Sequence, residues 1–296
     1  MRFLLDTLVL VSIYVLLAVG YVVVYRASKV LNLAHGDFMM LGGFSLFWIA
    51  TLTGTHAAGA GEIIGLSVIS IIISCLVGLI IYRIFIHPVL GEDPVIPVMV
   101  TIGLSIILRG IATFAWGSQP RYLASLMGIK NPYVELWGGY GLSRFDLILI
   151  AAAIFFIIAL GLFFRYYKRG IQIRAASENP LLASLSGVNI YSSFVLMWAV
   201  SIILASVAGI LYGITSHVDT SIGIIGLNAF SVAIVGGLYS LAGVVPAAFL
   251  IALAENAMAH FYDPLLAGVV PMAILLLVLI FRPWGILGRP EEIERV

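Results

Sequence analysis

Long apolar runs without charge are the feature that most constrains how this chain can fold. One charge-free stretch extends from Thr220 to Ala254 and covers 35 residues. A helix needs only about 20 residues to cross a hydrocarbon core of roughly 30 Å, so this stretch exceeds one crossing. Within it, "VGGLYSLAGVVP" (235–246) supplies glycines and a proline for a turn. We therefore predict two membrane segments joined by a turn within 235–246.

Composition extends this prediction to the whole chain. Of its 296 residues, 62% are hydrophobic and only 10% are charged, whereas soluble domains carry about 25% charged residues. The apolar runs are continuous, unlike the alternating segments of about ten residues that form membrane β-barrels. The predicted fold is an all-α, polytopic integral membrane protein, with one transmembrane domain over residues 1–296.

We expect eight or nine membrane segments, depending on how the second one is placed. The nine candidate segments lie at about 3–25, 30–53, 63–86, 95–116, 146–164, 190–215, 221–238, 241–261 and 264–281. The first is read as an uncleaved segment, because it is too long for the apolar core of a signal peptide. If 30–53 re-enters the membrane rather than crossing it, the number of crossings falls to eight.

Basic residues indicate the orientation. Lys and Arg gather in the connection 165–189 and in the tail after 281, which predicts that both are cytoplasmic. The connection 117–145 then lies outside, although it carries three basic residues of its own. Nine crossings place the N-terminus outside and the C-terminus inside.

Two segments suggest an inverted repeat. "LNLAHGDFMMLGGF" (31–44) can be aligned with "LNAFSVAIVGGL" (227–238), since both contain Leu-Asn followed by Gly-Gly. Inverted repeats with interrupted helices are typical of transporters. Chance similarity between two apolar sequences is the alternative.

The first of these segments contains an unusual polar cluster. Asn32, His35, Gly36 and Asp37 fall within six positions of an otherwise apolar run. One interpretation is a helix broken at Gly36 beside a translocation path, where polar residues inside a membrane usually lie. The other is that the three polar side chains satisfy one another and the broken backbone.

Further polar or flexible positions occur in the second half of the membrane region. Asn228, Gly236, Gly237 and Glu255 complete the set that we expect near a translocation path. Because intramembrane charges tend to pair, Glu255 is expected to contact another helix, with Arg109 or His260 as partner. The small residues Ala205, Gly209 and Gly213 predict a close helix contact, either internal or with a partner chain.

The connection 165–189 is much longer than the two to eight residues that usually join helices. Asn179 followed by Pro180 predicts a helix start, and Gly187 predicts its end. The short helix between them carries three leucines: Leu181, Leu182 and Leu185. Its apolar face is expected to pack either on this protein or headgroups, or in a groove of a soluble partner.

Several functions find no support in the sequence. No nucleophile, base and oxyanion site can be assembled, so catalysis is not predicted, and no metal-ligand spacing occurs around the single cysteine, Cys75. The chain lacks a G-x-x-x-x-G-K-[ST] motif and therefore a P-loop of its own. A net charge of +1 gives no indication of nucleic-acid binding. No cofactor is expected.

Five motifs together resemble a known family. They are "VLNLAHGDFMMLGGF" (30–44), "TIGLSIILRG" (101–110), the stretch 174–189 with "LASVAGILYG" (204–213), "LNAFSVAIVGGLYSLAGVVPAAFLIALAENA" (227–257) and "FRPWGILG" (281–288). Their order and spacing are similar to the permease subunits of bacterial ABC importers of branched-chain amino acids (LivH-type). The resemblance extends from about residue 5 to residue 288.

The resemblance implies one membrane half of an importer in a bacterial or archaeal cytoplasmic (inner) membrane. The implied partners are a second permease, two cytoplasmic ATP-binding subunits and an external substrate-binding protein. The implied contact with the ATP-binding subunits involves eight residues: Arg174, Glu178, Asn179, Pro180, Leu181, Leu182, Leu185 and Gly187. The implied cargo is a branched-chain or other hydrophobic amino acid, with urea, short amides and small aromatic acids as alternatives.

Two other classes of membrane protein stay open at the level of sequence. A stand-alone channel would use the paired Gly-Gly segments as half-helix loops. An ion-coupled carrier would use Asp37 and Glu255 as its coupling carboxylates.

Overall fold

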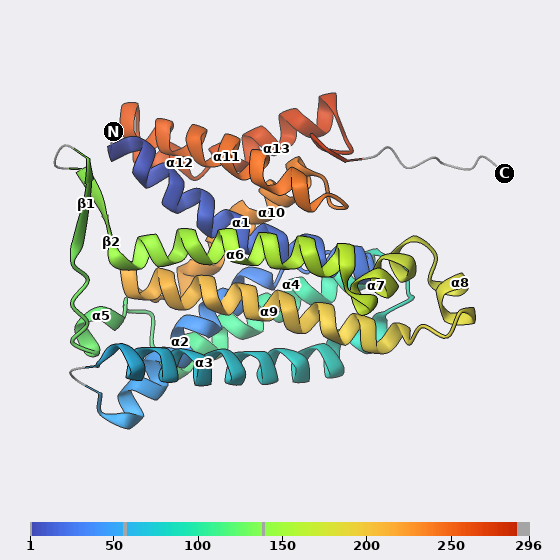
Figure 1. The fold of residues 1–296 in the computed structure, drawn as a ribbon, viewed down its shortest axis with the longest axis horizontal. Helices are drawn as coiled ribbons and strands as arrows, with labels where there is room; N and C mark the ends of the chain where they lie inside the picture. Colours follow the sequence, from blue (N-terminus) through green and yellow to red (C-terminus); the bar gives the residue numbers. More distant parts are fainter. Residues whose placement is uncertain (1, 56–57, 138–139, 289–296) are drawn as a thin grey trace.

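The computed structural model describes residues 2–55, 58–137 and 140–288. All nine predicted segments are helical (Figure 1). The membrane helices are α1 (Arg2–Ser28), α2 (His35–Thr53), α3 (Ala60–Ile81), α4 (Val95–Trp116), α6 (Arg144–Tyr166), α9 (Ile190–Thr215), α10 (Gly223–Gly236), α11 (Leu241–Phe261) and α13 (Val270–Phe281). Among the described residues, eight helical stretches are long and apolar enough to cross a membrane, and Thr220–Gly236 is shorter.

Short elements extend or connect these helices. A π-turn, η1 (Tyr82–Ile86), and a 3₁₀ turn, η2 (His87–Val89), continue α3 without interruption. A second 3₁₀ turn, η3 (Thr220–Ile222), leads into α10, and α12 (Pro264–Ala267) precedes α13. The remaining short helices are α5 (Leu123–Leu126), α7 (Lys168–Glu178) and α8 (Pro180–Leu185).

The connection 117–145 contains a feature that the all-α prediction did not include. Strands β1 (Tyr133–Trp137) and β2 (Tyr140–Ser143) pair antiparallel, with Tyr133 opposite Ser143. The hairpin lies outside the helix bundle at one end, so the membrane part is helical as predicted (Figure 1).

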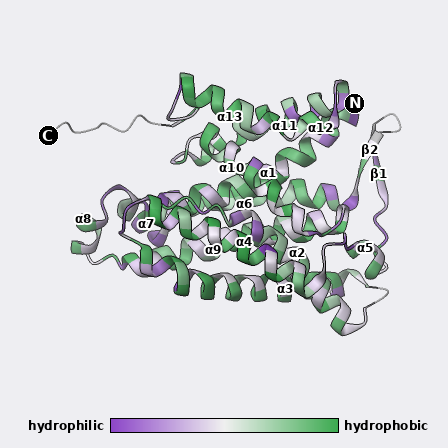
Figure 2. Cartoon of the chain, turned by 180° about the vertical axis from the view of Figure 1, so that it is seen from behind, coloured by the Kyte–Doolittle hydropathy of each residue, from purple (hydrophilic) through white to green (hydrophobic). Residues whose placement is uncertain are grey.

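The two ends of the bundle differ in content. In Figure 1, β1, β2, α5 and the start of α1 lie at the left, whereas α7 and α8 lie at the right. Figure 2 shows hydrophilic residues gathered mainly at these two ends and hydrophobic residues between them. This distribution is the one expected when the bilayer surrounds the middle of the bundle. The chain is therefore a multi-pass membrane protein.

Helix α1 is the central helix, and the helices around it cover most of its length. From Ile13 to Val24 every side chain of α1 is buried. It packs against α9, α11, α10 and α6. An apolar helix that is buried on all sides belongs in the interior of a bundle rather than against lipid.

The predicted turn within 235–246 is confirmed. Helix α10 ends at Gly236, and α11 begins at Leu241 with the Ser240 side chain accepting the Gly243 N–H. Gly237 has a φ of +99°, which L side chains rarely adopt. The C-terminal segment joins this turn through Ile286, whose N–H donates to the Val235 carbonyl at 2.7 Å. Thus the charge-free stretch forms two helices, as its length requires.

Candidate functional site

The chain leaves helical geometry before the polar cluster and not at Gly36. Helix α1 ends at Ser28, Lys29 has a left-handed φ of 54°, and residues 30–34 are non-helical until α2 begins at His35. Gly36 is therefore inside the first turn of α2, and the prediction of a break at Gly36 is wrong. A residue in the left-handed region ends helices commonly, and here Lys29 supplies it.

Asn32 and Thr101 satisfy the interrupted backbone. The Asn32 side-chain oxygen accepts the Ala34 N–H at 3.2 Å, and the Asn32 carbonyl accepts the His35 N–H at 3.1 Å. On α4, the Thr101 hydroxyl accepts the Leu33 N–H at 3.2 Å. Backbone groups without a partner would be costly inside a membrane, so these contacts make the interruption tolerable.

His35 and Asp37 contact different helices rather than each other. The His35 Nδ1 lies 3.1 Å from the Ser201 hydroxyl of α9, and its ring packs edge-on against Tyr21 of α1. Asp37 is fully buried, and its Oδ1 accepts a hydrogen bond from Arg109 Nε of α4 at 2.7 Å. The prediction that the three polar side chains satisfy one another is therefore wrong, although Asn32 does support the broken backbone.

The first turns of α2 and α10 touch through glycine. A Cβ on Gly226 would lie 2.2 Å from the Gly36 Cα, and a Cβ on Gly36 would lie 2.5 Å from the Gly223 carbonyl oxygen. A Cβ would clash at Gly36, at Gly223 and at Gly226, so none of these glycines can carry a side chain in this arrangement. We call residues 32–37 together with Gly223 and Gly226 the junction.

The junction lies within the bundle rather than at its end. His35 contacts Gly20, eight residues or about 12 Å before the end of α1. It also contacts Ser201, which is well inside α9. Helix α2 therefore begins within the bundle, as interrupted helices of transporters do.

Helices α2 and α10 run in opposite directions from the junction. His35 and Gly42 of α2 meet Ser201 and Ser206, so α2 is parallel to α9. Asn228 of α10 contacts Tyr14, and Tyr239, in the turn just after α10, contacts Tyr25, so α10 is parallel to α1. Since α1 and α9 are antiparallel in Figure 1, α2 and α10 are too.

This antiparallel arrangement is the geometry of an inverted repeat, but the predicted alignment pairs positions in different elements. Asn32 precedes α2, whereas Asn228 lies inside α10. The two Gly-Gly pairs also differ: Gly42 and Gly43 lie within α2, whereas Gly236 ends α10.

The Asp37 carboxylate occupies the place where the two helix starts converge. A Cβ on Gly223, the first residue of α10, would lie 2.5 Å from Asp37 Oδ1 and 3.0 Å from Arg109 Nη2. Helix N-termini favour negative charge, because their free N–H groups point outward. The junction thus contains its own anion, which balances Arg109.

Glu255 belongs to a second polar group. The Tyr14 hydroxyl donates to Glu255 Oε2 at 2.5 Å and accepts from Asn228 Nδ2 at 3.2 Å. Glu255 is half-buried, so part of it faces outward from the bundle. The expected pairing of Glu255 with another helix is confirmed, but its partner is Tyr14 of α1 and not Arg109 or His260.

A line of hydroxyl side chains along α1 escaped the sequence interpretation. Thr7 accepts from Asn256 at 3.0 Å, Tyr14 meets Glu255, and the Tyr21 hydroxyl donates to the Gly226 carbonyl at 3.1 Å. These three recur every seven residues, which places them on one face of a helix. Their seven-residue spacing is visible in the sequence and could have revealed this line of hydroxyl groups.

Gly236 and Gly237 lie apart from both polar groups. A Cβ on Gly236 would lie 2.7 Å from the Gly243 carbonyl oxygen, and one on Gly237 would lie 2.8 Å from the Gly288 nitrogen. Both glycines therefore allow close backbone packing near the end of α10. Gly209 likewise packs against the Met39 backbone of α2, so the small-residue face of α9 is internal.

The predicted short helix in the connection 165–189 is present. Helix α8 begins at Pro180, the Asn179 side chain accepts the Leu182 N–H at 3.0 Å, and Gly187 has a φ of +81°. The eight proposed contact residues of this region are all exposed: Arg174, Glu178, Asn179, Pro180, Leu181, Leu182, Leu185 and Gly187. The three leucines are 68%, 59% and 77% exposed, in chain order.

Helix α7 holds α8 beyond the end of the bundle. Ile173 and Ala176 of α7 are buried, and α7 packs against α6, α1 and α9. In Figure 1, α8 projects past the membrane helices. Within residues 2–55, 58–137 and 140–288, nothing covers the leucine face of α8.

Interrupted helices that meet inside a bundle, with buried charges at their junction, are typical of membrane transport proteins. Comparison with known proteins specifies which kind. Residues 3–279 match the family described as the permease component of the branched-chain amino acid transport system, and the chain belongs to that family.

Curated relatives cover almost the same length. The chain is 30% identical over 290 residues to the high-affinity branched-chain amino acid transport system permease protein BraD of Pseudomonas aeruginosa, covering 96% of this chain and 94% of that one. It is 30% identical to the corresponding protein LivH of Escherichia coli K12, with the same coverage. A probable LivH of Methanocaldococcus jannaschii is 26% identical over 94% of this chain and 89% of its own. No solved structure matches.

Proposed function

We propose that this chain is the membrane permease subunit of an ATP-driven importer of branched-chain or other hydrophobic amino acids. The relatives named for branched-chain amino acid transport support the cargo class. The chain has no P-loop motif, so ATP hydrolysis requires a separate subunit. It acts in a cytoplasmic (inner) membrane, with α7 and α8 on the cytoplasmic side in accordance with the basic residues of α7.

The exposed leucine face of α8 is the observation that carries the proposed coupling to an ATP-binding subunit. A six-residue helix has little stability of its own in water, and here its ends are fixed by Asn179 and Gly187. Three exposed leucines on such a helix match the way a short helix docks into a hydrophobic groove. Movement of α7 and α8 with the ATP-binding subunit would be transmitted to α1, α6 and α9, against which α7 packs.

We infer that cargo passes beside Glu255 rather than through the junction. At the junction the backbones of Gly36 and Gly226 are in contact, which leaves no space for a solute. Glu255 is only half-buried, so it can face a passage formed with a second permease subunit. Asn32, His35 and Asp37 then brace the interrupted helix, while Asn228 and Glu255 border the path.

An external substrate-binding protein would deliver the cargo at the opposite end, where α5 and the β1–β2 hairpin lie (Figure 1). The polar groups near the path are few, which suits a passage that does not retain its cargo. Urea and short amides are alternative cargoes, because the delivery protein would make most of the selection.

Co-purification and uptake test the proposal. We expect an ATP-binding subunit to co-purify with the wild-type chain and to be lost in the double variant Leu181→Asp, Leu185→Asp. The matched control is Tyr122→Asp, which changes an apolar side chain of 59% exposure in the connection 117–145, at the other end of the molecule. Because all three side chains are exposed and lie outside the membrane helices, none of these variants should unfold the chain.

Transport gives the second readout. The assembled complex in liposomes should accumulate labelled leucine only with ATP and binding protein, and excess isoleucine should compete whereas urea should not. Uptake by this chain alone without ATP would contradict the proposal. Competition by urea but not by isoleucine would show that the cargo is urea or a short amide and not a hydrophobic amino acid.

A further inference from the structure

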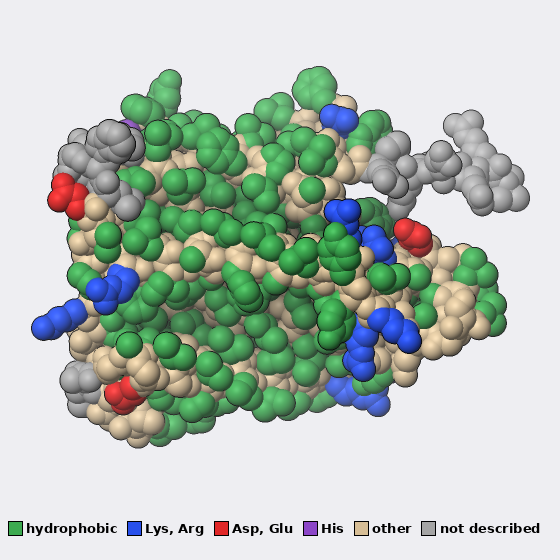
Figure 3. All heavy atoms as spheres, in the orientation of Figure 1, with side chains coloured by type: hydrophobic (Ala, Val, Ile, Leu, Met, Phe, Trp, Pro, Cys, Tyr) green, Lys and Arg blue, Asp and Glu red, His purple; other side chains and the backbone are tan. Residues whose placement is uncertain are grey.

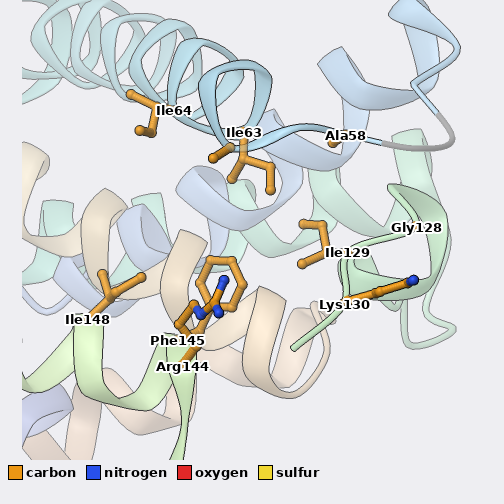
Figure 4. A pocket seen from close by; sticks show the side chains of 10 residues that line it. Ala58, Ile63, Ile64, Gly128, Ile129, Lys130, Arg144, Phe145 and Ile148 are labelled. Atoms are coloured by element: carbon orange, nitrogen blue, oxygen red, sulfur yellow. The ribbon is translucent and has the colours of Figure 1, made fainter. Parts of the chain in front are cut away.

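A groove with a cationic end lies between α3 and α6, with α9 behind it. Its outer part is a cavity of about 430 Å³ that is bordered by Lys130 and Arg144. Figure 4 shows Ile63 and Ile64 of α3 on one wall and Phe145 and Ile148 of α6 across from them. We call this feature the α3–α6 groove.

The groove continues toward the middle of the bundle. A deeper cavity of about 260 Å³ shares Ile63, Ile64, Phe145 and Ile148 with the outer one. It extends along α3 to Ile71 and is backed by α9 side chains such as Ile210. From Ala60 to Ile71 the groove covers eleven helical steps, or about 16 Å, and its deep part is almost entirely apolar.

The two cations are held at the mouth by backbone contacts. The Arg144 N–H donates to the Pro132 carbonyl at 3.2 Å, and the Asn131 side chain accepts the Phe145 N–H at 3.3 Å. These bonds attach the segment that carries Lys130 to the start of α6. Arg144 is the first residue of that apolar helix, so both cations lie at the level where the hydrocarbon region begins.

No carboxylate neutralises these cations within residues 2–55, 58–137 and 140–288, since neither Lys130 nor Arg144 takes part in an ion pair there. Two carboxylates near the ends of the same helices are engaged elsewhere. Glu62 accepts from the Thr55 hydroxyl at 3.0 Å, and Asp146 accepts from the Ser143 hydroxyl in a capping box. Lys130 and Arg144 are therefore without a direct ion-pair partner among the described residues at the mouth of the groove.

We propose that the α3–α6 groove binds an anionic phospholipid, with its headgroup between Lys130 and Arg144 and one acyl chain along the apolar groove. A charged head above a long apolar tail is the one chemistry that matches both parts. Basic pockets between membrane helices bind lipid headgroups of this kind. The outer rim supports the assignment, because Ile64, Val68 and Ile148 are 64%, 49% and 43% exposed and face the lipid directly. Figure 3 shows this face, with hydrophobic side chains along the bundle and both basic and acidic groups at its left end.

Lipid titration tests the site. The full-length chain, with any subunits that accompany it, is delipidated in mild detergent and titrated with phosphatidylglycerol or with phosphatidylcholine of identical acyl chains. Binding is followed by native mass spectrometry and by the rise in melting temperature. We expect phosphatidylglycerol to bind more tightly.

The variant Lys130→Gln, Arg144→Gln should weaken phosphatidylglycerol binding about 30-fold, since each cation near an anionic headgroup contributes about fivefold. The matched control Lys130→Arg, Arg144→Lys keeps both charges and should bind as the wild type does. A third variant, Ala152→Phe, fills the deep part of the groove and should weaken binding of both lipids without changing their ratio.

Equal affinity for the two lipids, or wild-type binding by the glutamine variant, overturns the proposal. So does a glutamine variant that keeps phosphatidylglycerol but loses an acidic soluble partner, because the cations would then serve protein docking. These readouts do not involve ATP or transport, so they are independent of the proposed importer function.

Discussion

The Asp37–Arg109 ion pair gives the sharpest prediction about how this membrane domain is held together. Asp37 is fully buried, the Arg109 side chain is 33% exposed, and Nε lies 2.7 Å from Oδ1. Two unit charges about 4 Å apart interact with about 4 kcal/mol at an effective dielectric constant of 20. The partial exposure of Arg109 reduces this, so we expect a coupling free energy of about 2–3 kcal/mol.

The perturbation is a double-mutant cycle with Asp37→Asn and Arg109→Met. Each single variant leaves one charge without its partner and should lose about 3 kcal/mol of unfolding free energy, at the lower end of values for broken buried pairs. The double variant removes both charges and should lose only about 3–4 kcal/mol. Unfolding is measured by titration with a denaturing detergent in mixed micelles, followed by circular dichroism.

A second cycle supplies the control. Arg109→Met combined with Glu255→Gln should be additive within about 0.5 kcal/mol, because Glu255 contacts Tyr14 and not Arg109. The reasoning is refuted if the Asp37–Arg109 cycle is additive, or if the Glu255–Arg109 cycle shows the larger coupling. A larger coupling between Glu255 and Arg109 would mean that these two residues pair, as the sequence analysis expected.

Two further predictions concern the packing around α1. Gly226→Ala should lower the free energy of unfolding by about 3 kcal/mol or more, because its Cβ would meet backbone that cannot move aside. The control Gly103→Ala, whose Cβ would have no atom within 4 Å, should be neutral or slightly stabilising in the same unfolding assay. Tyr14→Phe removes the hydroxyl between Glu255 and Asn228 and should cost about 1–3 kcal/mol, and a cost below 0.5 kcal/mol would show that the hydroxyl does not matter.

Sequence patterns predicted the elements of the fold closely, because those elements depend on local chemistry. The length of the charge-free stretch required a turn, and its glycines placed that turn correctly at the end of α10. Asn179, Pro180 and Gly187 likewise marked α8, since capping and left-handed termination act within a few residues. The β1–β2 hairpin was missed, as the prediction treated the connection only as a loop.

Partners in space were much harder to predict than elements. Asp37 and Glu255 both required a partner, and Arg109 was the obvious cation for either. Which carboxylate Arg109 contacts depends on how α4 packs against α2 and how α1 packs against α11. The spacing of residues within one helix carries no information about this packing. Gly36 shows the same limit: a glycine in a polar cluster suggests a break, but its actual use is to let α10 approach.

The sequence by itself therefore determined that the chain is a helical membrane protein, which stretches form its membrane helices, and which polar residues needed explanation. Those properties follow from hydrophobicity, length and local capping. Only the tertiary structure decided that α2 and α10 start face to face within the bundle, that Arg109 balances Asp37, and that Tyr14 holds Glu255. The physical reason is that these contacts join residues 72 to 241 positions apart, whose distance is set by the packing of whole helices.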